Sequence, residues 1–435
     1  MNIRLYNAKI LNPQKDHSFT ITEGEIWIQK DRIIYLGDGT DIDSVFSELP
    51  EKMILWDREM DINGNLILPG FKNAHTHTAM TFLRSLADDM PLSEWLTNQI
   101  FPREAQLTPE DIYVLTTLGL MEYVTSGITA NFDMYLSPIT AARAAVDCGF
   151  RTVQTSGLNN FSLSLSSMEE DYYRINEMSD LTSFVLGFHA EYTISKELME
   201  GVSTLAHTLK SPVWLHNSET KKEVEDCIGR WGKTPTELTD SLSLYDYGGG
   251  GYHCVWLSDH DIEIFKKNKL SIVTNPASNL KLASGIAPIQ RYLDEGIPLA
   301  IGTDGPASNN CLDMFREMYL CTALAKVHEQ DAAAVPAQEV LYMATSGGAH
   351  AMGLTDCVNL DPGQKADLIV IDLKQPNMQP QNHLVNNLVY SGSKQNVIMT
   401  MVNGRILYQD QKFYMDSDAE EIYQKANSII GRMRS

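Results

Sequence analysis

The middle of the chain alternates apolar runs of β-forming residues with helical stretches, and this alternation constrains the fold more than any other feature of the sequence. Strands and helices in regular succession are typical of a parallel sheet covered by helices. We predict eight strands, at residues 66–77, 127–135, 151–158, 183–191, 212–219, 251–258, 270–278 and 298–305. Because eight parallel strands close into a barrel, the predicted fold class is α/β, a (β/α)8 TIM-like barrel.

Both ends of the chain have the pattern of short antiparallel strands instead. We predict strands at 3–11, 24–36 and 53–68 near the N-terminus, and at 366–372, 397–402 and 405–408 near the C-terminus. Asn63-Gly64 and Asn403-Gly404 each favour a tight hairpin turn, because both residue types adopt positive φ. We therefore expect residues 1–65 and 360–435 to form one small β-sandwich, and residues 66–359 to form the barrel.

The sequence also predicts the local structure of three further segments. Residues 108–125 are expected to be helical, because Thr108 can cap the helix and Pro109 suits its first position. Residues 418–434 also have a helical pattern. The four glycines at 248–251 are expected to form a flexible or tightly turning loop before the sixth strand.

Composition and charge exclude several functional classes. With 43% hydrophobic and 21% charged residues over 435 positions, the chain has the make-up of a globular protein with a sizeable core. Its formal net charge of -22 repels phosphate backbones and anionic lipid headgroups, so we expect no nucleic-acid partner and no membrane association. Six dispersed cysteines, without a signal-peptide pattern or a long apolar span, predict reduced thiols in a cytoplasmic protein.

Polar residues at the ends of the predicted strands are the candidates for an active site, because the loops that follow barrel strands meet at one face. His75 and His77 end the first strand, where residues i and i+2 point to the same side. His216 ends the fifth strand and Asp304 the eighth. Three histidines and one aspartate suit zinc or another divalent ion, with one position left for water.

Each of these features alone has an ordinary structural explanation. A His-x-His pair is more often two solvent-facing histidines than a metal site, and a Gly-Thr-Asp-Gly segment is more often a turn. Their common position at one predicted barrel face favours the metal site.

Several longer motifs resemble one known family. They are Pro69-Gly70-Phe71, His75-Thr76-His77, Asn275-Pro276-Ala277-Ser278-Asn279-Leu280-Lys281-Leu282, Gly302-Thr303-Asp304-Gly305 and Ala366-Asp367-Leu368. The chain resembles the amidohydrolase superfamily over nearly its whole length, and within it the S-adenosylhomocysteine/methylthioadenosine deaminase branch, which also holds triazine chlorohydrolases and purine and pterin deaminases. The resemblance implies a barrel, a β-sandwich built from both termini, and a mononuclear metal site.

The resemblance also implies roles for individual residues. The metal ligands fall on His75, His77, His216 and Asp304, and the proton-shuttling pair falls on Glu219 and His253. A glutamate that binds ribose hydroxyls falls on Glu104, and a histidine that contacts the purine falls on His189. Trp95 could stack on a substrate ring, although a helical tryptophan between two leucines is more often part of a core.

Three positions depart from the family pattern. Glu191 replaces a proline that commonly follows the fourth-strand histidine, Ser156 stands where members that bind homocysteine have an arginine, and Thr274 replaces a histidine. Without that arginine, and with a further negative charge if Glu191 faces the pocket, we expect an anionic tail to bind poorly.

These observations predict a hydrolytic deaminase that acts on a small molecule. One divalent ion, zinc with iron as the alternative, lowers the pKa of water. Glu219 donates a proton to the ring, Asp304 accepts one from water, and His253 steers the nucleophile. The predicted substrate is an adenosine-type nucleoside such as methylthioadenosine, 5'-deoxyadenosine or S-adenosylhomocysteine, the last as a poorer substrate. The resemblance also implies a homo-oligomer.

Other functions stay open at this point. The same site fits a guanine or pterin deaminase or a triazine-type hydrolase, and a barrel that has lost catalysis could serve as a scaffold. His189-Ala190-Glu191 also matches the His-x-Glu of the cytidine-deaminase fold. That fold requires a Pro-Cys-x-x-Cys segment for its zinc, and the sequence contains none.

Overall fold

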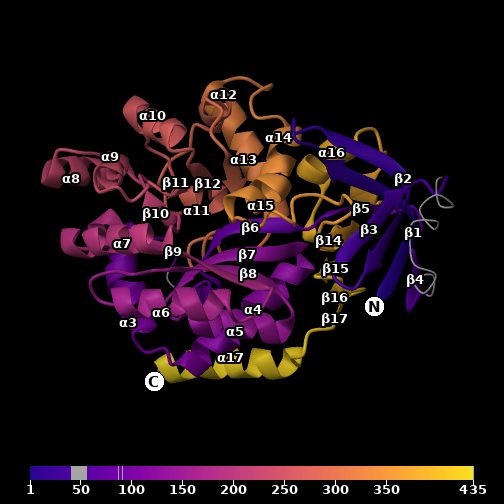
Figure 1. Cartoon of the computed structure of the whole chain (residues 1–435), viewed down its shortest axis with the longest axis horizontal. Helices are drawn as coiled ribbons and strands as arrows, with labels where there is room; N and C mark the ends of the chain where they lie inside the picture. Colours follow the sequence, from indigo (N-terminus) through magenta and orange to yellow (C-terminus); the bar gives the residue numbers. More distant parts are fainter. Residues whose placement is uncertain (41–55, 87, 91, 435) are drawn as a thin grey trace.

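A computed structural model of the chain describes residues 1–40, 56–86, 88–90 and 92–434. One of its two sheets has eight parallel strands in the order β13-β12-β11-β10-β9-β8-β7-β6 (Figure 1). They are β6 (Phe71–Thr76), β7 (Ile128–Tyr135), β8 (Arg151–Ser156), β9 (Thr182–Ala190), β10 (Val213–Asn217), β11 (Gly249–His253), β12 (Ser271–Thr274) and β13 (Leu299–Ile301). Two side-chain bonds join the outer strands: Asn73 donates to Thr303 Oγ1 at 2.7 Å and accepts from its backbone N–H at 2.8 Å. The predicted (β/α)8 barrel is confirmed.

Helices follow the barrel strands and cover their outer side (Figure 1). They are α4 (Pro109–Thr125), α5 (Pro138–Cys148), α6 (Leu165–Asn176), α7 (Lys196–Leu209), α8 (Lys221–Trp231), α9 (Pro235–Ser241), α10 (Asp259–Lys267), α11 (Pro276–Lys281), α12 (Ile289–Asp294), α13 (Met314–Glu329), α14 (Ala337–Tyr342), η5 (Met343–Gly347) and α15 (Gly348–Ala351). Thr108 caps α4 as predicted, in a capping box with Asp111. Between β6 and α4 lie η2 (Thr78–Leu83), α2 (Leu92–Trp95), η3 (Leu96–Ile100) and α3 (Phe101–Glu104).

The first predicted strand, 66–77, is wrong as a single strand. The chain changes sheets at Gly70, so that β5 (Leu66–Pro69) pairs with strands from the chain ends, and only β6 belongs to the barrel. A Cβ on Gly70 would lie 2.0 Å from the side chain of Thr129, so only glycine fits this close approach. Residues 66–69 therefore pair with the sheet of the chain ends and not with the barrel.

The glycine run is also placed differently from the prediction. Gly249 to Gly251 open β11 rather than forming the preceding loop. A Cβ on Gly250 would lie 2.1 Å from Ser271 O and 2.6 Å from the ring of Trp214. The missing side chains leave room for Trp214, which packs beside Tyr252 and Phe132 inside the barrel with ring centroids 5.2–5.3 Å apart. The glycines thus serve the packing of the barrel.

The other sheet, of nine strands, joins both ends of the chain. Its order is β17-β16-β15-β14-β5-β1-β2-β3, with β4 paired to β1. The strands besides β5 are β1 (Asn2–Pro13), β2 (Phe19–Gln29), β3 (Arg32–Gly37), β4 (Arg58–Asp61), β14 (Leu368–Ile371), β15 (Val397–Val402), β16 (Arg405–Gln409) and β17 (Lys412–Phe413). Ile26 in β2 and Met401 in β15 share one hydrophobic core, so the sheet folds over itself as a sandwich.

Of the turns and strands predicted for the sandwich, some are confirmed and others are wrong. Asn403 and Gly404, with φ of 52° and 74°, form the predicted hairpin between β15 and β16. Asn63 and Gly64 also have positive φ, but the strands they join both run parallel to β1, so the predicted hairpin is wrong. The predicted strand 24–36 is in fact the hairpin of β2 and β3. Of the predicted strand 53–68, residues 53–55 lie outside the described residues.

Between β14 and the C-terminus the chain forms short turns and one long helix. The turns are η6 (Pro376–Met378), α16 (Leu384–Asn386), η7 (Asn387–Ser391) and η8 (Lys394–Asn396). The predicted C-terminal helix is α17 (Ala419–Arg434), but it lies along α4 of the barrel (Figure 1). Arg432 pairs with Asp111 there at 2.5 Å. Residues from the predicted sandwich segment thus also support the barrel.

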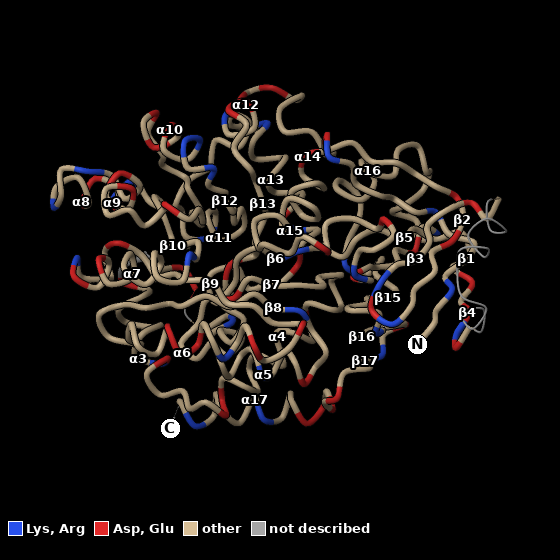
Figure 2. Tube along the Cα trace, in the orientation of Figure 1, with Lys and Arg blue, Asp and Glu red and all other residues tan. Residues whose placement is uncertain are grey.

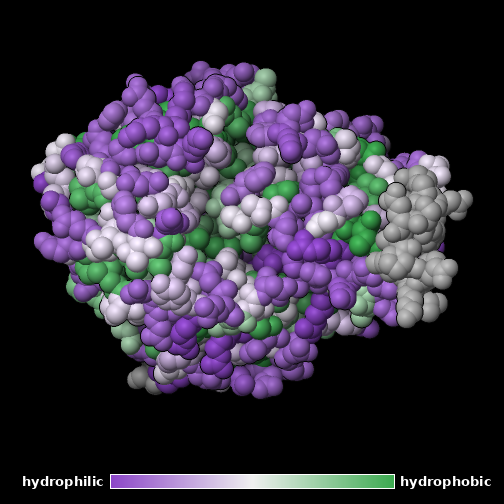
Figure 3. Space-filling model, in the orientation of Figure 1, coloured by the Kyte–Doolittle hydropathy of each residue, from purple (hydrophilic) through white to green (hydrophobic). Residues whose placement is uncertain are grey.

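The surface agrees with the acidic composition. Asp and Glu residues lie along several outer helices, among them α10, α12 and α17 (Figure 2). The face shown in Figure 3 is largely hydrophilic, with scattered hydrophobic residues. None of the described helices has the length and apolar character needed to span a bilayer. All six cysteines are free thiols, as predicted.

Candidate metal centre and active site

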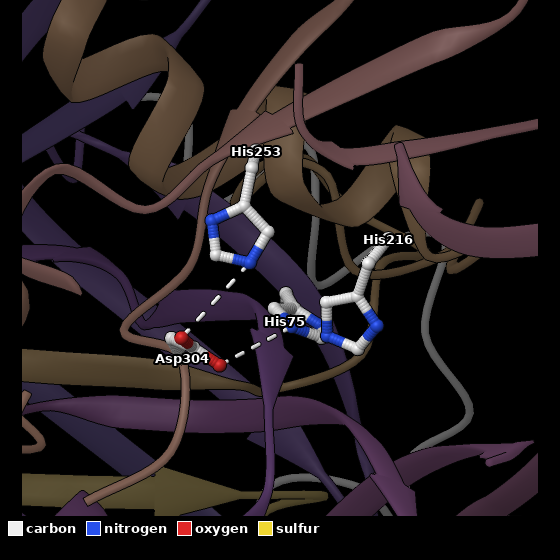
Figure 4. Close-up of side chains that lie close together, drawn as sticks. All are labelled: His75, His216, His253 and Asp304. Carbon is white, nitrogen blue, oxygen red and sulfur yellow. Dashed lines mark ion pairs between the residues drawn. The ribbon is translucent and has the colours of Figure 1, made fainter. Parts of the chain in front are cut away.

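Five ionisable side chains converge at the C-terminal ends of the barrel strands (Figure 4 shows four of them). His75 lies in β6, His77 directly follows it, His216 lies in β10, His253 ends β11, and Asp304 follows β13. Asp304 Oδ1 lies 3.4 Å from His75 Nε2 and 3.2 Å from His77 Nε2. Ligand atoms of His75, His216, His253 and Asp304 all lie within 4.8 Å of one another. The four residues predicted as ligands are therefore brought together, with His253 beside them.

Two of the histidines face each other in a way that requires a cation. His77 Nδ1 lies 2.6 Å from Met134 O, and His216 Nδ1 lies 2.7 Å from His189 O. A carbonyl oxygen only accepts, so each Nδ1 carries a proton, and each ring that holds no second proton presents the lone pair of Nε2. These two Nε2 atoms are 3.3 Å apart. Two lone pairs at this distance repel unless a proton or a metal ion lies between them.

The pKa shifts agree with this conclusion. Burial lowers the pKa of His75 to about 3, and neither of its ring nitrogens has a hydrogen-bond partner among the described residues. Burial also acts on His77, but the bond to Asp304 outweighs it and raises the pKa of His77 to about 9. Burial would raise the pKa of Asp304, yet His75 and His77 hold it well below its usual value. These pKa shifts favour a proton between the histidine nitrogens and Asp304, which is where a divalent ion would lie. The set of three histidines and one aspartate fits one such ion.

Asp304 is fixed by two hydroxyl groups. Ser278 Oγ and Ser308 Oγ donate to Asp304 Oδ2 at 2.6 and 2.7 Å, which leaves Oδ1 toward the histidines. Ser278 lies within the motif Asn275 to Leu282, and the distinctive composition of that motif could have identified this serine. Ser308 was missed, because an isolated serine after a strand has no distinguishing pattern.

The two predicted proton-handling residues lie next to the cluster. His253 Nε2 is 3.9 Å from Glu219 Oε2 and 4.0 Å from Asp304 Oδ2. The other ring nitrogen, Nδ1, donates to Asn279 Oδ1 at 2.7 Å, so Nε2 points into the site. Ser284 donates to Glu219 Oε1 at 3.0 Å. The arrangement leaves one atom of each residue, Glu219 Oε2 and His253 Nε2, available for proton transfer.

A cavity of about 540 Å³ opens onto this cluster. Of the predicted site residues, those that line it are Trp95, Glu104, His189, His77, His216, Glu219, His253 and Asp304. His75 is buried beneath it. Trp95 belongs to a hydrophobic cluster and also borders the cavity, so both interpretations of this tryptophan hold in part. The cavity is large enough for a nucleoside-sized ligand.

Glu104 is almost completely buried at the end of α3, with 8% of its surface exposed. Burial raises its pKa to about 7, against smaller opposing effects of the neighbouring Tyr135 hydroxyl and of His77. A desolvated carboxylate of this kind strongly favours a ligand that donates hydrogen bonds to it.

Two predicted substrate-specificity positions do not face the cavity. Ser156 is buried at the end of β8, where its hydroxyl accepts from Leu158 N at 3.1 Å, and the loop beyond it lines the cavity instead. Glu191 is buried on the far side of its turn and pairs with Arg230. Ser156, predicted to contact substrate, therefore does not line the cavity, and Glu191 adds no charge to the pocket. Side-chain direction depends on the turn after each strand, which the sequence pattern did not reveal.

Comparison with known proteins agrees with the geometry. The sequence model of the amidohydrolase family matches residues 66–407. The chain belongs to the amidohydrolase family. A 5-methylthioadenosine/S-adenosylhomocysteine deaminase from Syntrophomonas wolfei is 38% identical to this amidohydrolase over 440 residues, which cover 100% of this chain and 99% of the relative. A 5'-deoxyadenosine deaminase from Methanobrevibacter smithii is 38% identical over 441 residues, covering 99% and 98%.

A solved structure resembles this amidohydrolase over nearly its whole length. An adenosine deaminase from Xanthomonas campestris with bound zinc is 30% identical, with a TM-score of 0.92, and the match covers 99% of this chain and 98% of that one. The barrel and the terminal sheet of this amidohydrolase therefore belong to one shared architecture.

Proposed function

We propose that this amidohydrolase is a hydrolytic deaminase that removes the exocyclic amino group of an adenosine-type nucleoside as ammonia. The observation that carries the proposal is the convergence of Glu219, His253 and Asp304 on a cavity whose wall includes the buried Glu104. The names of its relatives from Syntrophomonas wolfei and Methanobrevibacter smithii support it. We further propose zinc as the ion, since the similar Xanthomonas campestris enzyme binds it, and a cytoplasmic location in keeping with the six free thiols.

The chain's own residues handle the protons of this reaction. His75, His77, His216 and Asp304 would hold the ion, which when bound lowers the pKa of water from 15.7 to about 7. Asp304 accepts a proton from the attacking water. Glu219 donates a proton to the ring nitrogen beside the amino-bearing carbon, which makes that carbon a better electrophile.

The two remaining requirements are charge stabilisation and departure of ammonia. His253 stabilises the charge that develops on the attacking oxygen when Nε2 also carries a proton to donate, and Asn279 aims this nitrogen into the site. Ammonia leaves after it receives a second proton, and Glu219 and Asp304 are the acids close enough to relay it.

Two cavity residues favour a nucleoside over a free base. Glu104 can accept hydrogen bonds from two ribose hydroxyl groups, and a free base offers none. His189 also lines the cavity and is available to the purine ring. Burial lowers the pKa of His189 to about 3, so this imidazole is neutral at pH 7 and can donate or accept at the ring edge.

We propose that the 5' end of the nucleoside lies against uncharged side chains. The uncharged residues that line the cavity include Trp95, Leu96, Ile100, Phe101 and Leu136. Within the described part of the chain, no lysine or arginine lines the cavity, whereas three carboxylates do. A substrate carboxylate would remain unpaired there, which costs roughly 2 to 5 kcal/mol. We therefore propose 5'-deoxyadenosine or methylthioadenosine as better substrates than S-adenosylhomocysteine.

An ammonia-release assay tests the proposal. Purified protein is compared on 5'-deoxyadenosine, methylthioadenosine, adenosine, S-adenosylhomocysteine, adenine, guanine, a pterin and a triazine. We expect the highest kcat/KM on the first two compounds. Turnover confined to free bases, pterins or triazines would overturn the nucleoside assignment, and a preference for S-adenosylhomocysteine would overturn the charge argument alone.

A further inference from the structure

In the turn that follows β9, some side chains face the cavity and one faces the protein interior. In η4 (Glu191–Thr193), Tyr192 and Thr193 line the cavity, and His189 lines it just before the turn. Glu191 points the other way, its side chain is 0% exposed, and its Oε1 contacts Nη2 of Arg230 on α8. The carboxylate therefore contributes nothing to the pocket surface and instead ties the turn to a neighbouring helix.

Helix α8 also contacts a second part of the site, at the N-terminal end of the helix. Glu223, in its first turn, accepts the backbone N–H groups of Ser218 at 3.0 Å and Glu219 at 2.7 Å. Glu223, Cys227 and Arg230 are spaced four and three residues apart, which places them on one face of the helix. The thiol of Cys227 lies beside Glu191 on that face. One face of α8 thus contacts both Glu219, the proton-shuttling acid, and η4, the turn that carries Tyr192.

The ion pair gives the turn a defined position. A buried carboxylate that loses its ionic partner is strongly unfavourable, so Glu191 is held at Arg230 rather than free to rotate. Arg230 is 42% exposed and reaches the pair from the surface. The backbone next to the turn also matters, because His189 O fixes the imidazole of His216 at 2.7 Å.

We propose that the Glu191–Arg230 pair is a positioning device that sets Tyr192 and His189 against the nucleoside and thereby determines substrate affinity. The inference rests on the deaminase function proposed above and concerns its specificity. Neither Glu191 nor Arg230 lines the cavity, so both act through η4.

Three variants with neutral side chains of similar shape test the pair: Glu191→Gln, Arg230→Gln and the double variant. We expect each to raise KM for 5'-deoxyadenosine about tenfold, or about 1.4 kcal/mol, with kcat within about twofold of wild type and metal content unchanged. The double variant should lose no more than either single variant, because one interaction is removed in all three. Unlike Arg230→Gln, it leaves no unpaired buried charge, so it should fold even where that single variant fails.

The matched control is Lys222→Gln on the same helix. Lys222 pairs with Asp226 at 2.8 Å, but the two side chains are 77% and 45% exposed and face solvent. This variant should leave both KM and kcat unchanged. A lower melting temperature in the Glu191 and Arg230 variants with an unchanged KM would show a merely structural role and overturn the proposal.

A crystal structure of Glu191→Gln decides the question independently of turnover. We expect η4 and the Tyr192 side chain to be displaced relative to the wild-type protein. If they occupy the same positions, the positioning role is refuted, whether or not the enzyme deaminates nucleosides. If the wild-type protein releases no ammonia from any nucleoside while η4 shifts in the variant, only the proposed function fails.

Discussion

Replacing Glu104 with glutamine should weaken the use of substrates that carry ribose hydroxyl groups. The change keeps the size of the side chain and removes its charge. Glu104 is nearly buried in the cavity wall, and no lysine or arginine lines the cavity in the described chain to neutralise it. Besides the neighbouring Tyr135 hydroxyl, the ribose hydroxyls are therefore the donors that this carboxylate can bind.

The structure sets the size of the effect. A hydrogen bond to a charged group contributes about 1.5–3 kcal/mol, and each 1.36 kcal/mol is a factor of ten in rate. The Glu104→Gln variant should therefore lose about 10- to 150-fold in kcat/KM on 5'-deoxyadenosine. Glu94→Gln is the matched control, because Glu94 is exposed on the same segment of the chain.

The pH profile provides a second measure. Burial raises the pKa of Glu104 to about 7, so the carboxylate that accepts the ribose hydroxyls is lost as the pH falls through 7. In wild type, kcat/KM on a nucleoside should decline below about pH 7, by up to tenfold per pH unit. The Glu104→Gln variant has no carboxylate to protonate there and should lack that part of the decline.

The assay compares two substrates in both proteins, adenosine and 2',3'-dideoxyadenosine. Only adenosine offers the ribose hydroxyls, so the substitution should reduce kcat/KM on adenosine and change the dideoxy compound by less than about twofold. Equal losses on both substrates, or a low-pH decline that persists unchanged in the variant, would refute the role of Glu104 as the ribose-binding residue.

Three further predictions follow from the same site and its support. Elemental analysis should find close to one equivalent of divalent metal per chain, and chelation should abolish turnover; full activity of the metal-free protein would contradict the mechanism. Glu219→Gln and His253→Asn should each lower kcat more than about a hundredfold while metal content and circular dichroism stay unchanged, and near-normal rates would show that the proton transfer is assigned wrongly. Arg151→Leu should destabilise the fold by about 3–5 kcal/mol in urea unfolding, because it leaves Asp367 as an unpaired buried charge, whereas Arg405→Gln at an exposed pair should change stability by less than about 0.5 kcal/mol.

Part of the site could be predicted from the sequence because barrel strands place their ends at one face. Once the strands were located by their apolar runs, His75, His216 and Asp304 had to lie near one another. Glu219 and His253 follow the same rule, two positions after β10 and at the end of β11. The motifs that resemble the amidohydrolases added Glu104, which lies outside the barrel strands and has no periodicity of its own to reveal it.

The sequence by itself determined the alternation of strands and helices, the terminal sheet, the helix cap at Thr108 and the candidate metal-binding side chains, because these depend on local pattern and residue chemistry. Only the tertiary structure decided where each side chain points. Glu191 turns toward Arg230 and Ser156 faces inward because the turns after β9 and β8 set their directions, and Gly70 moves the chain between sheets because Thr129 leaves no room for a side chain. Contacts between residues far apart in the sequence fix these outcomes, and a linear pattern does not contain them.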